Sequence, residues 1–352
     1  MATQSAIVVQ EPGRAVLRQD AAIPELPENY ILVKTKAVAL NPTDWRHIDY
    51  VACNGATVGC DYAGIVEEVG AMVAKSFKKG DRVAGFVHGS NAARLNGGAF
   101  AEYVIAKGDL QIRIPDHMSF EAAATFGVGL TTVGQNLYQI LELPLPGEET
   151  LEGDEAEETN ILIYGGATAT GSLAIQLARL SGLRVVTTCS EANRTLMFEL
   201  GAHAVFDYHD PEVSEQIKED TDDALELVLD TISTPQSASI CSAAISSAGG
   251  SYNALLDVRS AREDVDSHVS MAYDVLGEPY RMSAQEFTPD SANFEFGVKW
   301  WSTVQKLLEE RRIMPHPYQV KSGGLEGALS GLQLLREGKV RASKLVYQIG
   351  SS

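Results

Sequence analysis

The sequence is poor in cysteine, in positive charge and in long apolar runs. It has four cysteines in 352 residues and no Cys-x-x-Cys pair, so neither a disulfide framework nor a zinc knuckle is predicted. Lys and Arg total 28 against 47 Asp and Glu, a formal charge of −19. Nucleic acids and anionic membranes need clustered cations, so neither is an expected partner.

Targeting signals are also missing from the pattern. No apolar run approaches the roughly 18 residues of a membrane-spanning helix. The first residues, MATQSAIVVQEPGRAV, lack the apolar core of a signal peptide. A cytoplasmic protein with reduced thiols is therefore expected.

Seven of the acidic residues lie in one stretch. Residues 144–160 (PLPGEETLEGDEAEETN) contain these seven and no base. A run of like charges repels itself and stays hydrated, which predicts a solvated loop. Without this stretch the remaining chain still carries a formal charge of −12, that is −19 less −7.

The apolar pattern divides the chain into two domains. The first 115 residues contain short β-branched segments separated by Gly, Pro and Asp turns, which indicates a β-rich module. From residue 160 onward, continuous apolar strands alternate with helices, as in a parallel sheet covered on both faces. The last strand, residues 344–349, is expected to return to the first domain. The predicted fold class is α/β, with a catalytic domain of residues 1–126 and 289–352 and a doubly wound domain of residues 127–288.

A Gly-rich turn opens the doubly wound domain. Residues 161–182 (ILIYGGATATGSLAIQLARLSG) read as a buried strand, a turn and a helix. The N–H groups and dipole of such a helix N-terminus bind a dinucleotide pyrophosphate. Gly165, Thr168 and Gly171 occupy the three spaced positions, so threonine replaces the middle glycine. The place of the turn between strand and helix favours a dinucleotide site over a plain tight turn.

The second strand of this domain bears on the choice of cofactor. It ends at Ser190, about 25 residues after Gly165, where an NAD site places a carboxylate for the ribose diol. Ser190, Asn193 and Arg194 stand there and are suited to a 2′-phosphate, although Glu191 lies nearby. NADPH is therefore preferred over NADH.

Five spaced motifs now carry a resemblance. They are NPTDWRH (41–47), VGCDYAGIVEEVG (58–70), KKGDRVAGF (78–86), GGAFAEYV (97–104) and the cofactor turn. In this order they resemble the medium-chain dehydrogenase/reductases along nearly the whole chain. The resemblance implies a GroES-like catalytic domain and a Rossmann cofactor domain.

The zinc ligands of that family are missing. Zinc-dependent members place a cysteine just before the position of Thr43–Asp44 and a His-Glu pair after that of Gly59. This chain has Pro42 and Cys60-Asp61 there. Because catalytic zinc needs three protein ligands, no metal is predicted.

Within the zinc-independent branch, the chain looks most like the fungal trans-acting enoyl reductases of polyketide synthases. Four strings carry this likeness: GVGLTTVGQNL (127–137), YGGATATGS (164–172), TCSEAN (188–193), which follows Thr187, and EGKVRASKLVYQI (337–349). It implies NADPH-dependent reduction of an α,β-unsaturated polyketide thioester held on an acyl carrier domain.

The resemblance also implies site residues. For NADPH they are Thr43, Asp44, Trp45, Arg46, Ala167, Thr168, Ala169, Thr170, Ser190, Glu191, Ala192, Asn193, Tyr208, Leu255, Leu256, Val340 and Arg341. For the substrate they are Thr132, Gly277, Glu278, Pro279, Tyr280 and Arg281.

Thr132 and Arg46 are the candidate catalytic residues. Negative charge develops on the thioester oxygen during hydride addition, and the Thr132 hydroxyl is a candidate donor to it. The family often has lysine where this chain has Arg46; arginine holds an oxygen but does not deliver a proton. Two alternatives remain open at this point: a zinc-free quinone or enone reductase, and a non-catalytic NADPH-binding scaffold. Either a monomer or a homodimer is compatible with the sequence.

Overall fold

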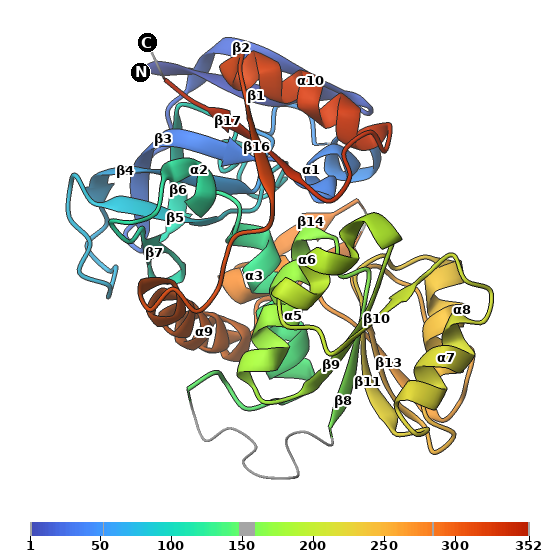
Figure 1. Cartoon of the computed structure of the whole chain (residues 1–352). Helices are drawn as coiled ribbons and strands as arrows, with labels where there is room; N and C mark the ends of the chain where they lie inside the picture. The colour runs from blue at the N-terminus through green and yellow to red at the C-terminus, as the bar shows by residue number, and fades with distance from the viewer. Residues whose placement is uncertain (1, 52, 148–158, 284, 351–352) are drawn as a thin grey trace. The chain divides into compact units, whose positions relative to one another are not determined.

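The computed structural model describes residues 2–51, 53–147, 159–283 and 285–350 (Figure 1). Most of the predicted acidic loop, residues 148–158, lies outside this set. The chain forms two compact units, which are described separately below. Unit 1 comprises Met1–Val128 and Tyr273–Ser352, and unit 2 comprises Gly129–Ala272.

Unit 1 is built on a seven-stranded sheet in the order β16-β17-β3-β4-β5-β7, with β6 also paired to β3. A separate antiparallel pair is formed by β1 and β2, and β1 also makes isolated bridges from Ala6 to Ala101 and from Val8 to Thr57. The strands of the unit are β1 (Thr3–Glu11), β2 (Arg14–Ala22), β3 (Tyr30–Ala39), β4 (Asp61–Val69), β5 (Arg82–Phe86), β6 (Tyr103–Lys107), β7 (Ile112–Arg113), β14 (Tyr280–Met282), β15 (Gln285–Phe287), β16 (Tyr318–Lys321) and β17 (Lys344–Gln348).

Alternation of side chains explains the central strand of this sheet. In β3, Ile31, Val33 and Thr35 are buried, whereas the alternating residues Leu32, Lys34 and Lys36 are partly exposed. This period of two places one face on the core and the other toward water. The final strand, β17, pairs antiparallel with β3, so the predicted return of the C-terminal strand to the first domain is confirmed.

α-Helices of 4 to 19 residues and a π-helical turn complete unit 1. They are α1 (Pro42–Arg46), a π-helical turn (His47–Val51), α2 (Phe120–Ala123), α9 (Ser291–Glu309) and α10 (Gly324–Arg336). Ser119 caps α2 by accepting a hydrogen bond from the Ala122 N–H. Trp300 and Trp301 on α9 are fully buried and pack inside the unit.

Unit 2 is a six-stranded, all-parallel sheet in the order β10-β9-β8-β11-β12-β13. The predicted doubly wound sheet is thus confirmed, and α5 covers one face while α7 and α8 cover the other (Figure 1). Its elements are α3 (Gly127–Gly134, which begins in unit 1), a π-helical segment (Gln135–Ile140), β8 (Asn160–Tyr164), α5 (Ala169–Leu180), β9 (Arg184–Cys189), α6 (Arg194–Glu199), β10 (Ala204–Asp207), α7 (Val213–Asp220), β11 (Leu225–Asp230), α8 (Pro235–Ala244), β12 (Gly250–Ala254) and β13 (Val265–Val269).

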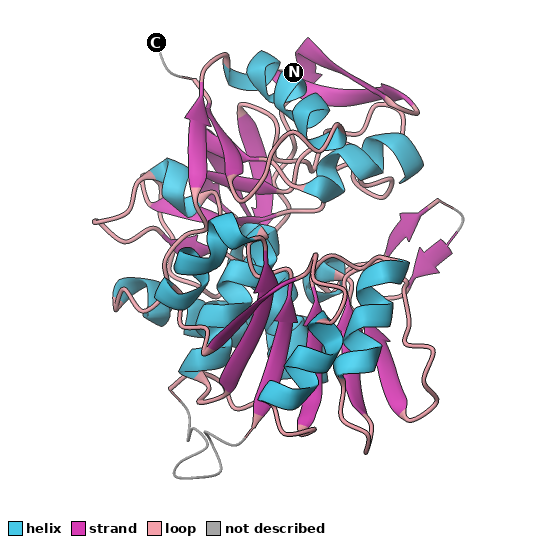
Figure 2. Cartoon of the chain, turned by 45° about the vertical axis from the view of Figure 1, so that its right-hand side comes forward, coloured by secondary structure: helices cyan, strands magenta, loops and turns pink. Residues whose placement is uncertain are grey.

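The strand order of unit 2 fixes where a ligand binds. Neighbouring strands β8 and β11 lead to connections on opposite sides of the sheet, which makes them the switch point of the fold. Ligands of open parallel sheets bind at the carboxyl ends of the strands beside such a point. Figure 2 shows the strands of this sheet running side by side between flanking helices.

The observed division of the chain differs from the predicted limits. It falls after Val128 and after Ala272, so residues 273–288 belong to unit 1 and not to the doubly wound domain. Contacts within unit 1 explain this placement: Tyr273 stacks on His88, and Glu278 forms an ion pair with Lys107.

A buried ion pair joins distant parts of unit 1. Lys344 of β17 donates to the Asp61 carboxylate of β4 at 2.5 Å and to the Thr125 carbonyl at 3.0 Å. The other oxygen of Asp61 accepts the Val128 N–H at 2.7 Å. Breaking such a pair leaves an uncompensated buried charge, so the ion pair fixes the segment that begins α3.

In the described part of the chain, no helix is long and apolar enough to cross a membrane.

Candidate functional site

The turn between β8 and α5 has the geometry of a phosphate-binding loop. Gly165 has φ +82°, a conformation that favours glycine, and a Cβ on Gly171 would lie 2.4 Å from the Gly165 carbonyl oxygen. These two positions therefore need glycine for conformation and for close approach. Ala167, Thr168, Ala169 and Thr170 follow as half-buried residues.

Thr168 has a defined role in this turn. Its hydroxyl caps α5 by accepting the Gly171 N–H at 2.9 Å, and it lies 2.9 Å from the Thr231 hydroxyl. Thr231 in turn donates to the carbonyls of Tyr164 and Gly165. The threonine that replaces the middle glycine thus ties the end of β8 to the end of β11.

A buried carboxylate organises the loop after β11. Asp230 is fully buried and accepts four hydrogen bonds, from the N–H groups of Ile232 and Ser233 and from the hydroxyls of Ser237 and Tyr252. The Ser233 hydroxyl then accepts the N–H of Leu255 at 2.8 Å. This network joins the carboxyl ends of β11 and β12.

The remaining predicted cofactor residues of unit 2 follow the ends of β9, β10 and β12. Ser190 accepts a hydrogen bond from the Asn193 side chain at 3.1 Å, and Glu191 and Ala192 beside them are exposed. Tyr208 is partly exposed, and its ring lies 4.0 Å from that of His209. Leu256 is likewise partly exposed. Parallel strands end at one edge, so these residues and the turn share that edge of the sheet.

A nicotinamide dinucleotide fits this edge. The first N–H groups of a helix have no acceptor within the helix. Thr168 takes that of Gly171, which leaves those of Ala169 and Thr170 for an anionic ligand. The glycine turn permits close approach of the backbone, and Thr231 and Ser233 line the adjacent strand end. The residues present therefore suit a pyrophosphate.

In unit 1, α1 presents Thr43 and buries Asp44. The Asp44 carboxylate accepts the Asn41 N–H at 2.7 Å, which closes the first turn of the helix. Its other oxygen, Oδ1, is buried without a hydrogen-bond partner. Burial raises the pKa of Asp44 to about 7. Asp44 is thus an internal group, and Thr43 is the residue of this pair that reaches the surface of the unit.

Behind Thr43 lies a cluster of aromatic and polar side chains. The Thr43 hydroxyl is 2.9 Å from that of Tyr273, which is 3.6 Å from the Cys60 sulfur. The Tyr273 ring stacks on His88 with centroids 3.6 Å apart, and His47 lies 5.4 Å from Tyr273. Burial lowers the pKa of both histidines, that of His88 well below its ordinary value.

The predicted substrate segment 277–281 is held by this unit. Glu278 pairs with Lys107 at 3.2 Å and accepts the Tyr30 hydroxyl at 2.6 Å. Tyr280 donates to Asp274 at 2.6 Å and stacks on Phe287. Gly277 has φ +59°, and Pro279 and Arg281 are exposed. Glu278 and Tyr280 therefore have internal partners already.

The other predicted site residues of unit 1 are partly buried or exposed. Arg46 lies over the Trp45 ring at 5.6 Å, and Arg336 lies over the same ring at 5.9 Å. Val340 packs against the core and Arg341 is exposed. In unit 2, Thr132 is buried on α3, and its carbonyl accepts a hydrogen bond from Asn136.

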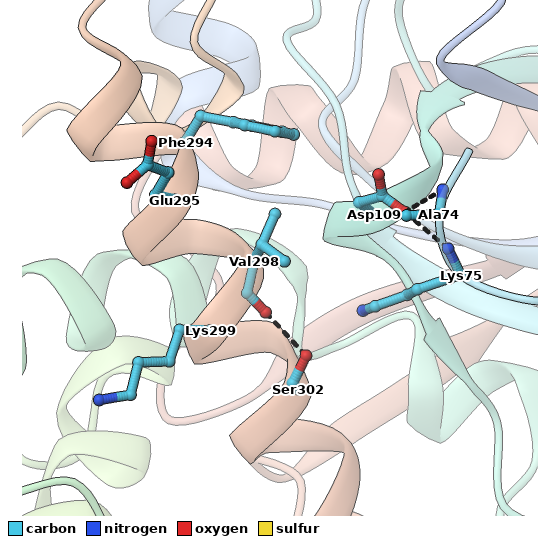
Figure 3. Close-up of a pocket in the computed structure, with 8 residues that line it drawn as sticks. All are labelled: Ala74, Lys75, Asp109, Phe294, Glu295, Val298, Lys299 and Ser302. Carbon is cyan, nitrogen blue, oxygen red and sulfur yellow. Dashed lines mark hydrogen bonds between the residues drawn. The ribbon is translucent and has the colours of Figure 1, made fainter. Parts of the chain in front are cut away.

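Across the described ranges, no three His, Cys, Asp or Glu side chains are grouped so as to hold a metal ion. Unit 1 carries an open hollow of about 540 Å³ between α9 and the loops at Lys75 and Asp109 (Figure 3). Burial lowers the pKa of Lys75 to about 8, and its ammonium donates to the Gln111 carbonyl. None of the predicted site residues lines this hollow.

Sequence reasoning missed several of these residues. Asp230, Thr231 and Ser233 follow a strand of the parallel sheet, so polar residues at a strand end were the available signal. Tyr273 had no comparable signal, because 230 residues separate it in sequence from Thr43.

Comparison with protein-family models finds two matches. Residues 27–116 match the alcohol dehydrogenase GroES-like domain, and residues 169–252 match the family described as zinc-binding dehydrogenase. Three curated relatives align over most of the chain. The chain is 49% identical to the trans-enoyl reductase resD of Aspergillus sclerotiorum, with 98% of this chain and 99% of the relative covered. It is 54% identical to the trans-enoyl reductase TOXD of Cochliobolus carbonum (82% and 96% covered) and 45% identical to ACTTS2 of Alternaria alternata (99% and 100% covered).

Solved structures share the fold. A putative zinc-dependent alcohol dehydrogenase protein from Rhizobium etli CFN 42 matches with a TM-score of 0.81 at 22% identity, with both chains fully covered. The quinone oxidoreductase from Coxiella burnetii matches with a TM-score of 0.73 at 22% identity, covering 99% of this chain and 100% of that one. CurK enoyl reductase gives 0.72 at 17% identity with the same coverage. At these identities the likeness establishes the fold alone.

Proposed function

Because this chain belongs to the trans-enoyl reductases of the medium-chain dehydrogenase/reductase family, we propose that it reduces an α,β-unsaturated polyketide thioester on an acyl carrier domain. The observation that carries the proposal is the 45–54% identity to three trans-enoyl reductases over most of the chain. The resemblance of the motifs supports the same substrate class, and the glycine turn of unit 2 supports a dinucleotide cofactor.

We propose NADPH as that cofactor. Nicotinamide cofactors are implied for the family, and strand β9 ends at Cys189 and is followed by Ser190 rather than by a carboxylate. Ser190, Asn193 and Arg194 are suited to a 2′-phosphate, because they offer hydroxyl, amide and guanidinium donors. The turn at 167–170 would hold the pyrophosphate, with Tyr208 and Leu255–Leu256 at the neighbouring strand ends. Thr43–Arg46 and Val340–Arg341 would supply the contacts from unit 1.

The bound cofactor supplies the hydride, and the protein supplies orientation and electrostatics. Addition at the β-carbon moves negative charge onto the thioester oxygen, which a preorganised hydroxyl such as that of Thr132 would stabilise. Arg46 would hold an oxygen of cofactor or substrate but would not protonate the α-carbon, because guanidinium keeps its proton at neutral pH. Residues 277–281 would border the substrate, with Glu278 fixed by Lys107.

The proposed partner is an acyl carrier domain, which is itself acidic. A chain of charge −19 needs local cations to bind an acidic partner, and exposed Lys78 and Arg312 in unit 1 are candidates.

We also propose that the reaction takes place in the cytoplasm, where thiols stay reduced. All four cysteines are free in the structure, in keeping with that compartment.

Three acceptors test the proposed reaction. NADPH oxidation is measured with a carrier-bound enoyl thioester, with the matching N-acetylcysteamine thioester and with a soluble quinone. The proposal expects the highest kcat/KM on the carrier-bound thioester and slower turnover of the small thioester. A preference for quinone would instead assign a quinone reductase. NADPH binding without turnover of any enone would assign a scaffold.

The choice of cofactor has its own test. We expect kcat/KM for NADPH to exceed that for NADH, and Arg194→Ala to lower it by roughly tenfold for NADPH alone, the effect of losing one charge-assisted hydrogen bond. Arg179→Ala is the matched control, because Arg179 is exposed in the last turn of α5, away from the glycine turn. Equal use of NADH by the unchanged protein would contradict the assignment.

A further inference from the structure

The side chain that contacts the Thr43 hydroxyl comes from a distant part of the sequence. Tyr273 is 5% exposed, and its hydroxyl lies 2.9 Å from Thr43 Oγ1 and 3.6 Å from Cys60 Sγ. The longer distance suits sulfur, which is a larger acceptor than oxygen. All three residues lie in unit 1, and Thr43 alone among them is partly open to solvent.

The order of donors and acceptors in this cluster follows from counting protons. Burial raises the pKa values of Cys60 and Tyr273 well above their ordinary values, so each keeps one proton to donate. A thiol is only a weak hydrogen-bond donor, whereas a phenol hydroxyl is a stronger one. In the 3.6 Å contact between the two, the Tyr273 hydroxyl therefore donates and the Cys60 sulfur accepts.

The consequence reaches Thr43. When Tyr273 donates to Cys60, its oxygen is free to accept the proton of Thr43. The Thr43 hydroxyl then points inward, and its lone pairs face out of the unit. A lone hydroxyl on a helix surface would instead rotate freely and present either its proton or its lone pairs.

The Tyr273 ring is held in place by its neighbours. It stacks on His88 at an interplanar angle of 8°, and Tyr280 packs edge-on against the same imidazole at 5.1 Å. His88 is buried, and burial lowers its pKa well below the ordinary value. A neutral imidazole therefore forms the stack against the Tyr273 ring.

We propose that Tyr273 is a positioning residue that fixes the Thr43 hydroxyl as a hydrogen-bond acceptor facing the bound nicotinamide cofactor. This inference rests on the proposed function, which places Thr43 among the cofactor contacts. The expected partner of the Thr43 oxygen is a donor group of the cofactor, either a hydroxyl or an amide N–H. Neither the motif nor the family match points to Tyr273.

Binding of NADPH, followed by its fluorescence, tests the proposal without relying on turnover. Tyr273→Phe keeps the ring stack and removes the hydroxyl, and we expect the Kd for NADPH to rise roughly 2- to 10-fold, the effect of one neutral hydrogen bond. Thr43→Val should have a similar effect. The double variant should bind no more weakly than Thr43→Val alone, because Tyr273 acts only through Thr43.

Tyr62→Phe is the matched control. Tyr62 is buried in the same unit and donates to Gln111 at 2.9 Å, so its loss should lower the free energy of unfolding but leave the Kd for NADPH unchanged. If Tyr273→Phe fails to fold, Cys60→Ala gives an independent reading, since it removes the acceptor of the Tyr273 proton. An unchanged Kd in the variant that folds, or independent effects of Tyr273 and Thr43 in the double variant, would overturn the proposal.

The outcome is separable from that of the proposed function. A wild-type protein that binds NADPH but reduces no enoyl thioester would refute the reaction, while the binding series would still decide the role of Tyr273. Conversely, normal thioester reduction with unchanged binding by Tyr273→Phe would refute the role of Tyr273 alone.

Discussion

At the scale of single residues, Asp44 is the most perturbed acid of unit 1 near the candidate site. It is 1% exposed, and one of its oxygens has no hydrogen-bond partner. Burial disfavours its charged form and raises its pKa to about 7. The folded protein therefore holds a proton on Asp44 over a pH range in which the unfolded chain has released it.

This property predicts a pH-dependent stability difference between the wild type and Asp44→Asn. Because the folded pKa is raised, the stabilising contribution of the protonated acid is complete below about pH 4 and is lost as pH rises to about 7. The free energy of unfolding of the wild type should fall relative to that of the variant by about 1.4 kcal/mol per pH unit across this range.

Urea unfolding of both proteins between pH 4.5 and 8 measures this difference. Comparing the two proteins cancels the contributions of His47, His88 and the other titrating groups that they share. The difference should level off above about pH 7, where Asp44 is ionised in both states. A difference that stays constant with pH would show that Asp44 is ionised throughout.

At the scale of elements, the turn from β8 into α5 depends on Thr168, which replaces the middle glycine, and on its contact with Thr231. Thr168→Ala should lower the free energy of unfolding by about 1 kcal/mol, because it removes the N-cap of α5. It should also weaken NADPH binding several-fold, since the contact with Thr231 is lost. Thr168→Ser keeps the hydroxyl and is the matched control. Wild-type NADPH affinity in Thr168→Ala would contradict a role of this pair in shaping the turn.

The sequence predicts the elements of unit 2 better than those of unit 1. The strands β8, β9 and β11 are mostly buried and belong to the parallel sheet that the sequence predicts from residue 160 onward. The strand β2 lacks such a pattern, because RAVLRQDAA is mostly exposed or half-buried, and it is formed by pairing with β1. The strand β2 forms because β1 lies beside it, and the local sequence of β2 does not reveal that neighbour.

The candidate site shows the same division. The glycine turn is encoded within a few residues, so its position was predictable from spacing. The contacts of Thr43 with Tyr273, of Glu278 with Lys107 and of Asp61 with Lys344 join residues more than 170 positions apart. A single sequence names the first member of each pair but not its partner.

At the scale of the whole molecule, the negative charge excluded some partners without identifying the ligand. The charge of −19 argued against nucleic acid, yet both proposed ligands, NADPH and an acyl carrier domain, are anionic. Local donors resolve this for the cofactor: the N-terminus of α5 and Arg194 lie in unit 2, at the β8–α5 turn and after β9. Net charge therefore bears on partner classes, and local geometry decides which anions bind.

Transfer of a labelled hydride tests the central claim most directly. The protein is incubated with NADPH deuterated at the transferable position and with an enoyl thioester on an acyl carrier domain, and the product is examined by mass spectrometry and NMR. The account predicts a saturated thioester with one deuterium at the β-carbon for each NADPH oxidised. Recovery of the unsaturated thioester from a protein that binds NADPH and reduces a quinone would contradict it.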